Sequence, residues 1–218
     1  LATHLLEIIK KNLGRLLTMK ALRRLLDEMT KLSDPARAEA NRRLLDEMIP
    51  DRVPPDLLHS VLRLLLAEQV SIRNLPLILE ATAEARHGHS TPEMICEHVR
   101  QSLGFQLVAA LRRDDGSLPL IQLAPEWETT FMTYQIEGER GAPDVALPPE
   151  TFNALTKAVS AELSKAGERG LFPAIVTSTA RRRFLRTVIA ARHIANPVLS
   201  FEEIGVDANP SLIGVVAA

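Results

Sequence analysis

The sequence predicts an α+β chain of several subdomains, in which an all-helical subdomain is followed by an α/β subdomain with a small mixed sheet. The first observation is a leucine-dense stretch, 53–86, whose apolar residues recur at the three- and four-residue intervals of a helix. The second is a change of period at Gly104, after which strand-like runs alternate with helical ones. With 218 residues, 46% of them hydrophobic, the chain can form one large or two small cores. The predicted parts are 1–17, 18–103 and 104–218.

The first three predicted helices carry many charged residues. Residues 1–17 have apolar positions at helical spacing, and Thr18 is a residue type that caps the next helix, Met19 to Lys31. A third helix is expected from Ala36 to Met48. The heptapeptide Arg-Arg-Leu-Leu-Asp-Glu-Met is present in both of these last helices, at positions 23–29 and 42–48. Two copies are too few for a solenoid, so we interpret the repeat as a local duplication.

The stretch 53–86 is predicted to be a tight helical hairpin and the core of the helical subdomain. Pro54 and Pro55 can begin a helix, because the first helical turn does not use the N–H that proline lacks. The helix that follows is so apolar that protein must cover nearly all of it. Asn74 is of a residue type that caps helices, and it precedes a second apolar helix, Leu77 to Ala85.

The remaining elements are predicted from turn residues and from the change of period. Thr91 and Pro92 begin a helix that Gly104 ends. The other expected elements are strands at 105–111, 118–123, 173–178, 197–200 and 211–216, helices at 125–135, 149–166 and 180–193 (the last capped by Thr179), a turn at 114–116 and a loop at 138–149. The first two strands form a predicted hairpin, so the sheet should not be purely parallel.

Composition excludes several classes of protein. A single cysteine, Cys96, cannot form a disulfide framework, and its apolar helical position predicts a buried structural thiol in a reducing compartment. No run approaches the roughly 18 apolar residues of a membrane helix. Aromatic residues make up 4% of the chain, too few for a base-stacking nucleic-acid platform. There is no signal peptide and no starting Met, so we expect a piece of a longer protein.

Charge is distributed unevenly, although the formal net charge is −1. Residues 1–52 contain 11 Lys/Arg and 8 Asp/Glu, residues 114–168 contain 3 and 10, and residues 171–218 contain 5 and 3. A solvated surface explains such runs, and ends of opposite charge also suit contacts between copies or with partners.

No motif supports catalysis or nucleotide binding, since neither GxxxxGK[ST] nor GxGxxG occurs. His87 and His89 are candidate metal ligands, but no Cys, His or carboxylate flanks them at ligand spacing, which favours a solvated turn. Ser178 precedes a predicted helix but lacks the glycines of a nucleophile elbow, which favours capping. We therefore predict a protein that is not an enzyme and that has no cofactor and no metal site.

The strongest positive feature is an arginine cluster at the start of the predicted helix 180–193. Arg181, Arg182, Arg183 and Arg186 form a basic patch that could contact phosphates or an acidic protein. In the alternative interpretation, the apolar residues of this helix face the sheet, and the arginines cover the outer side and pair with the domain's own acidic stretch. The small net charge and the few aromatic residues weigh against nucleic acid.

A further pattern resembles a known family. The run Val70 to Leu75, followed by Ile78 to Ala81, resembles a signature of the flagellar and type III secretion export-gate family (FlhA/SctV type). The resemblance extends from Ala2-Thr3-His4-Leu5 to the segment 197–204. Asn74 stands where the family more usually has Asp, and because both residues cap helices the departure changes little.

The resemblance implies a non-enzymatic docking platform, the C-terminal cytoplasmic part of a bacterial inner-membrane protein whose membrane half precedes this segment. Such a platform forms a nonameric ring below the membrane channel and receives export chaperones with their bound substrates. Other partners would be the ATPase complex and the gate partner of the export apparatus. Residues 1–17 would then be the last helix of an upstream subdomain, without most of its packing partners.

The resemblance also assigns site residues. Thr3 matches a position in the groove that receives chaperones with their cargo, although a helix cap is the plain interpretation of a threonine at a helix start. Arg73 and Asn74 could lie at a subunit interface of the ring, and an equal alternative is that they merely cap and brace the turn. The loop 138–149 and the junction near Gly104 are the predicted hinges.

Two alternatives stay open at the level of the sequence. A helical nucleic-acid-binding module would use the basic helix from Arg181 to Arg192. Within the export-gate family, the motifs quoted are shared by the flagellar and the virulence branches, and the general resemblance favours the flagellar one.

Overall fold

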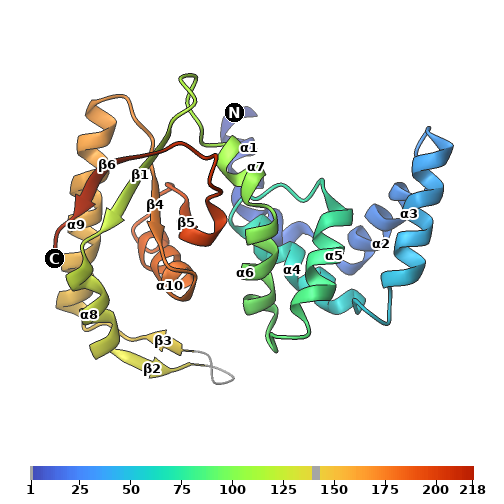
Figure 1. The fold of residues 1–218 in the computed structure, drawn as a ribbon, viewed down its shortest axis with the longest axis horizontal. Coiled ribbons are helices and arrows are strands. Elements are labelled where there is room, and N and C mark those ends of the chain that lie inside the picture. Colours follow the sequence, from blue (N-terminus) through green and yellow to red (C-terminus); the bar gives the residue numbers. More distant parts are fainter. Residues whose placement is uncertain (1, 139–142) are drawn as a thin grey trace. The chain divides into compact units, whose positions relative to one another are not determined.

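The computed structural model describes residues 2–138 and 143–218, and the side chains of residues 2–7 and 11 lie outside this description. The chain divides into two compact units, Leu1–Leu103 and Gly104–Ala218. The first unit is built from helices, and the second combines helices with two small sheets (Figure 1). The predicted fold class is confirmed.

Capping residues mark the first helices of the helical unit. The helices of this unit are α1 (Ala2–Leu16), α2 (Met19–Met29), α3 (Pro35–Met48), α4 (Pro55–Ala67), α5 (Leu75–Ala85) and α6 (Pro92–Ser102). Thr18 caps α2 as predicted, because its Oγ accepts a hydrogen bond from the Ala21 N–H at 3.1 Å. Asp34 begins α3 in the same way, with its Oδ1 3.0 Å from the nitrogen of Ala36.

The predicted hairpin of α4 and α5 is the core of the helical unit, and α6 packs against both helices. The side chains of this core that have no exposed surface are Leu58, Val61, Leu62, Leu65, Ile78, Leu79 and Val99. Complete burial of one such side chain contributes about 1.5–3 kcal/mol. The hairpin therefore holds this unit together mainly through apolar contact, to which the buried Arg100 of α6 adds an ion pair with Glu68 at the end of α4.

The C-terminal part of α1 packs closely on α4. A Cβ on Gly14 would lie 2.7 Å from the carbonyl oxygen of Arg63, so only glycine allows this approach. Arg63 Nε donates a hydrogen bond to the Gly14 carbonyl at 2.8 Å, and His59 Nε2 lies 2.6 Å from the Leu17 carbonyl oxygen. Earlier on α1, the apolar side chain of Ile8 stays 46% exposed.

The second unit contains a four-stranded sheet of order β5-β4-β1-β6, in which every neighbouring pair is parallel. Its elements are α7 (Gly104–Ala109), β1 (Leu118–Leu123), α8 (Pro125–Thr133), β2 (Gln135–Glu137), β3 (Pro143–Val145), α9 (Pro149–Glu168), β4 (Ala174–Thr177), α10 (Thr179–Ala190), β5 (Val198–Ser200), the 3-10 helix η2 (Phe201–Glu203) and β6 (Pro210–Val216). In the described residues antiparallel pairing is confined to β2 and β3. The expectation that the sheet is not purely parallel is therefore wrong for the four-stranded sheet.

The predicted hairpin at the start of this unit is wrong, because residues 104–109 form the helix α7. The turn after it does form: the Arg113 N–H bonds to the Ser117 carbonyl at 2.9 Å, and Gly116 takes a φ of 81°. A short apolar run such as 105–111 does not distinguish strand from helix by its period. Here Val108 is buried against the sheet from a helix.

Each face of the four-stranded sheet has its own apolar cluster. On one face, α8, α9 and α10 pack over Ile121, Ile175 and Val198. On the other face, α7 and the segment leading to β6 pack over Leu118, Leu120, Ala174, Val176 and Leu199. The crossovers from β1 to β4 and from β4 to β5 thus lie on one face, and the crossover from β5 to β6 lies on the other.

The predicted loop 138–149 is in part a strand. Its residues Pro143–Val145 form β3, which pairs antiparallel with Gln135–Glu137. Residues 139–142 lie outside the described residues. Gly104, at the other predicted hinge, lies against η2, since a Cβ there would be 2.2 Å from the carbonyl oxygen of Glu203.

Candidate interaction surfaces

Among the residues that the structure describes, no group of three metal-ligand side chains is close enough to hold a metal ion. Likewise, no helix in the described ranges is long and apolar enough to cross a membrane. The predicted solvated turn fits His87, which is exposed. His89 differs, since its Nδ1 is buried without a partner and its ring lies 6.1 Å from that of His98.

The start of α10 is organised by Glu202 rather than by a capping hydroxyl. Ser178, not Thr179, occupies the N-cap position, and its side chain makes no capping hydrogen bond. Thr179 Oγ1 instead donates to Glu202 Oε2 at 2.7 Å. Partial burial raises the pKa of Glu202, but hydrogen bonds from Thr179, the local backbone and Ser200 outweigh it, so the pKa lies below its ordinary value.

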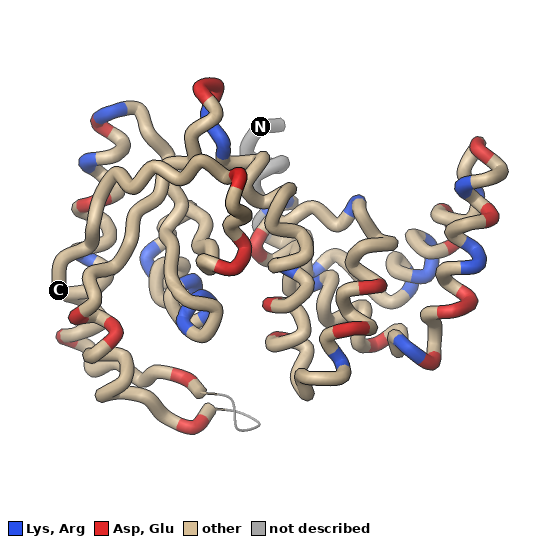
Figure 2. The backbone as a smooth tube through the Cα atoms, viewed as in Figure 1, with Lys and Arg blue, Asp and Glu red and all other residues tan. Residues whose placement is uncertain are grey.

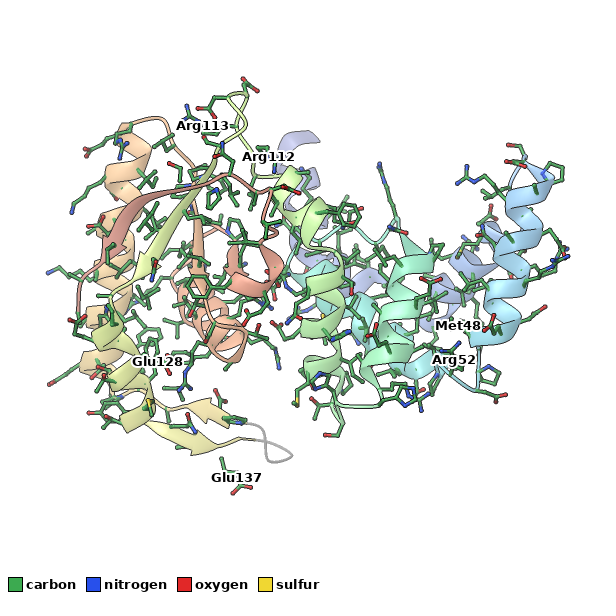
Figure 3. The ribbon with its side chains drawn as sticks, viewed as in Figure 1. Met48, Arg52, Arg112, Arg113, Glu128 and Glu137 are labelled. Carbon is green, nitrogen blue, oxygen red and sulfur yellow. The ribbon has the colours of Figure 1, made fainter. Side chains whose placement is uncertain are left out.

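Arg181 links three elements of the second unit. Its Nη2 donates to Glu128 Oε1 on α8 at 2.8 Å, and its Nε donates to the same carboxylate at 2.9 Å. The same Nη2 also donates to Gln135 Oε1 on β2 at 3.0 Å. Only 8% of the Arg181 side chain is exposed, whereas Glu128 is half exposed. Figure 3 shows Glu128 on α8. Two hydrogen bonds from one guanidinium to one carboxylate fix the orientation of the two side chains as well as the distance between them.

Arg182 is the largest fully buried side chain in the described part of the chain. Its Nε lies 3.7 Å from Glu203 Oε1, and both side chains are at most 1% exposed. Arg182 Nη1 also donates to the Val198 carbonyl at 3.3 Å. Removing one member of such a pair leaves an uncompensated buried charge.

The four arginines therefore do not form one surface patch. Arg181 and Arg182 are buried in ion pairs, Arg186 is half-buried and donates to the carbonyls of Ile194 and Asn196, and Arg183 is exposed. The alternative interpretation fits only in part: Arg181 pairs with Glu128 of the acidic stretch 114–168, but Arg182 pairs with Glu203 outside it, and both arginines are buried instead of covering the outer side.

The turn between α4 and α5 exposes Arg73. The chain leaves α4 through Gln69, whose φ is 59°, and Val70 N–H bonds to the Leu65 carbonyl at 2.9 Å. Asn74 takes the N-cap position of α5 but makes no side-chain capping bond. The Arg73 side chain forms no ion pair with any described residue. Arg73 is thus available to another molecule.

Thr3 belongs by its backbone to α1, but its side chain falls outside the described residues. Its predicted role in chaperone binding therefore stays a prediction.

Sequence reasoning missed the acidic partners of the arginines. Glu203 closes a capping box with Ser200: Ser200 Oγ accepts from the Glu203 N–H at 3.2 Å, and Glu203 Oε2 accepts from the Ser200 N–H at 3.1 Å. The spacing Ser-x-x-Glu in Ser200-Phe201-Glu202-Glu203 is the signal that could have revealed this box. No comparable signal marks Glu128 as the partner of Arg181.

Comparison with known proteins identifies the family of the chain. The family described as FHIPEP matches residues 1–209. The flagellar biosynthesis protein FlhA of Caulobacter vibrioides is 35% identical over 216 residues, which are 99% of this chain and 30% of that protein. The chain thus spans 30% of the length of the first curated relatives it matches.

Solved structures share the fold. Nonameric EPEC SctV-C matches with a TM-score of 0.83 at 20% identity, over 97% of this chain and 61% of that chain. Chlamydia pneumoniae CdsV, in a structure with CdsO, matches with a TM-score of 0.77 at 21% identity, over 98% of this chain and 60% of that chain. The predicted resemblance to the FlhA/SctV type is confirmed: the family match covers nearly the whole sequence, and the chain belongs to the FHIPEP family.

Proposed function

We propose that this chain is a docking platform of a type III protein export gate, on the cytoplasmic side of a bacterial inner membrane. The observation that carries the proposal is the family match over residues 1–209, and the fold shared with SctV-C over 97% of the chain supports it. The 35% identity to a flagellar biosynthesis protein favours flagellar export over virulence secretion.

The platform would receive export chaperones with bound substrates, and Thr3 would contribute to the groove that holds them. A pull-down of flagellar export chaperones tests this, using the 218-residue chain and a longer chain that restores the upstream sequence. Binding by the longer chain, lost on Thr3→Arg and kept on Thr187→Arg at an exposed site of α10, would support the groove. Equal binding by both variants would overturn it.

The platform would also assemble into a ring, for which the nonameric state of SctV-C is the precedent. We propose Arg73 and Asn74 as subunit contacts, since Arg73 is exposed and has no ionic partner among the described residues. Sedimentation of Arg73→Glu should show a smaller assembly than the unchanged chain. The matched control is Arg169→Glu, which makes the same charge change at an exposed site of the second unit.

Partners from the export apparatus, such as an ATPase complex and a gate partner, complete the proposal. The solved structure of CdsV with CdsO is a precedent for a bound partner. Docking with domain motion would use the junction at Gly104 and the loop 138–149 as hinges. Hydrogen exchange tests this point, because amides at both places should exchange faster than those of α4 and α5.

A nucleic-acid-binding module is disfavoured as the second candidate. Arg181 and Arg182, the first two arginines of the basic helix, are buried and paired with Glu128 and Glu203. A filter-binding titration over salt should therefore show neither tight binding nor a steep salt slope.

A further inference from the structure

The topology of the parallel sheet marks one place where a ligand would fit. From β1 the chain moves to β4 and then to β5 on one side, and it returns across the opposite face to reach β6 on the other side of β1. The chain therefore leaves β1 over one face of the sheet and reaches its neighbour β6 over the opposite face, so the topological switch point lies between these two strands. In open parallel sheets, the carboxyl ends of the strands at such a switch point frame a crevice.

A pocket of about 550 Å³ lies at this place. The carboxyl ends of the two strands meet the start of α8, since Ala124 N–H bonds to the Val216 carbonyl at 2.9 Å and Trp127 Nε1 donates to the Ala217 carbonyl at 3.1 Å. The pocket is lined by α8, by the first turns of α9 and by the end of the chain, through Trp127, Thr130, Thr133, Tyr134, Glu150, Thr151, Ala154 and Ala218.

The polar atoms of the lining are mostly hydrogen-bond acceptors. Thr130 and Thr133 already donate their hydroxyl hydrogens to the carbonyls of Glu126 and Thr129, so their oxygens can only accept. Within the described ranges, the Glu150 carboxylate has no ionic partner and the Tyr134 hydroxyl has no hydrogen-bond partner. A ligand for this lining must therefore bring several donors.

The surroundings of the pocket favour a positive ligand. Residues 124–156 contain six Asp/Glu and one Lys/Arg, and of these Glu128 is paired with Arg181 of α10. Figure 2 shows acidic positions on α8 and on the β2–β3 hairpin beside it. Lys157 begins the next turn of α9, beyond the lining residue Ala154. Two aromatic side chains line the pocket. Tyr134 is half-buried and supplies a flat surface on which a delocalised cation can stack, whereas Trp127 is 4% exposed and already stacked on Phe131.

We propose that this pocket binds an arginine side chain presented by a partner protein. A guanidinium group is planar, always charged and carries five N–H donors, which matches an acceptor-rich lining with one accessible aromatic ring and one free carboxylate. Glu150 pairs with the guanidinium and Tyr134 stacks on it. The inference does not require the chain to form a ring or to bind chaperones.

The lining contains its own reporter, because Trp127 and Tyr134 are the single tryptophan and the single tyrosine of the sequence. The experiment titrates the 218-residue chain with acetyl-Gly-Arg-Gly-amide and follows tryptophan fluorescence and the single indole N–H resonance. Both signals should change together and saturate at millimolar peptide, as expected for one side chain. The same peptide with Glu in place of Arg should change neither signal.

Two variants separate the pocket from general attraction to an acidic protein. Glu150→Gln should weaken binding of the arginine peptide about tenfold, because it removes a charged hydrogen-bond acceptor. Glu168→Gln, which makes the same change at the far end of α9, should leave binding within about twofold. Equal weakening by both variants would overturn the proposal, as would a lysine peptide that binds as tightly as the arginine peptide or an absence of saturable change.

Discussion

The α4–α5 hairpin and the helix α10 organise their respective units in opposite ways. The hairpin buries leucine, isoleucine and valine, and its four fully buried α4 residues are all aliphatic. Helix α10 also buries Leu185 and Ile189, but it buries Arg181 and Arg182 beside them. The first arrangement depends on apolar area, and the second depends on charges that have partners elsewhere in the chain.

The difference changes what a substitution does. A truncated leucine in the hairpin leaves a cavity whose cost depends on how far the neighbours relax. A truncated arginine in α10 leaves Glu203 charged and buried, which is a penalty that packing cannot relieve. Charge pairs also fix direction: Arg181 places α10 against α8 and β2 through named atoms, whereas the leucines of α4 would tolerate small shifts.

The largest effect is expected for Arg182→Met. Loss of the guanidinium should lower the free energy of unfolding by about 3–5 kcal/mol, because the Glu203 carboxylate stays buried without its partner. Urea unfolding followed by Trp127 fluorescence reports on this unit, since Trp127 lies in α8. The double variant Arg182→Met with Glu203→Gln should recover part of the loss. A double variant as unstable as the sum of the two single ones would show that the charge is not the cause.

Leu62→Ala should have the next largest effect. The side chain has no exposed surface, so truncation should cost about 2–5 kcal/mol through lost burial and a cavity. Helical circular dichroism during urea unfolding measures it, because α1–α6 contain more helical residues than α7–α10 of the second unit. The control is Leu32→Ala, at a side chain 38% exposed, with an expected cost within about 0.5 kcal/mol. Similar losses at both positions would contradict an apolar core centred on α4.

The same contrast explains what could be predicted from the sequence. The hairpin was predictable because its apolar spacing is local and recurs over more than two turns of each helix. The run 105–111 is too short for its period to decide, and it was assigned to a strand although 104–109 form a helix. Strands β2 and β3 have three residues each, and neither stands out from the polar residues around it.

The candidate sites also combine features that can be recognised from the sequence with features that depend on tertiary structure. Arginines at the start of α10 could be recognised from the sequence, but their burial could not, because Glu128 and Glu203 are brought to them by tertiary structure across 53 and 21 residues. The pocket at the switch point joins residues of α8 and α9 with Ala218, which follows β6. The strand order of the sheet brings these lining residues together, and that order depends on pairings between segments that are distant in the sequence.

Glu128→Gln tests the more exposed of the two charge pairs and should have a smaller effect. The change keeps the shape and one acceptor but removes the charge opposite Arg181, whose side chain is 8% exposed. Because Glu128 is half open to solvent, the expected cost is about 1 kcal/mol in urea unfolding followed by Trp127 fluorescence. Glu126→Gln is the matched control, also in the first turn of α8 and exposed, and without an ionic partner in the described residues. Equal costs would assign the effect to the helix dipole rather than to the pair.

The smallest effect concerns pH and Glu202, at the start of α10. Because the pKa of Glu202 lies below its ordinary value of 4.5 in the folded chain, its ionised form stabilises the fold. That stabilisation is present above pH 4.5 and is lost as the pH falls through the folded pKa. Glu202→Gln should therefore lower the urea midpoint slightly at pH 7, and the gap to the unchanged chain should close as the pH falls below 4.5. Thr179→Val should also lack this pH-dependent stabilisation, because Thr179 donates the hydrogen bond to Glu202. A gap that stays constant down to pH 3 would show that the carboxylate does not stabilise this end of α10 and would leave the buried pair of Arg182 as its main electrostatic support.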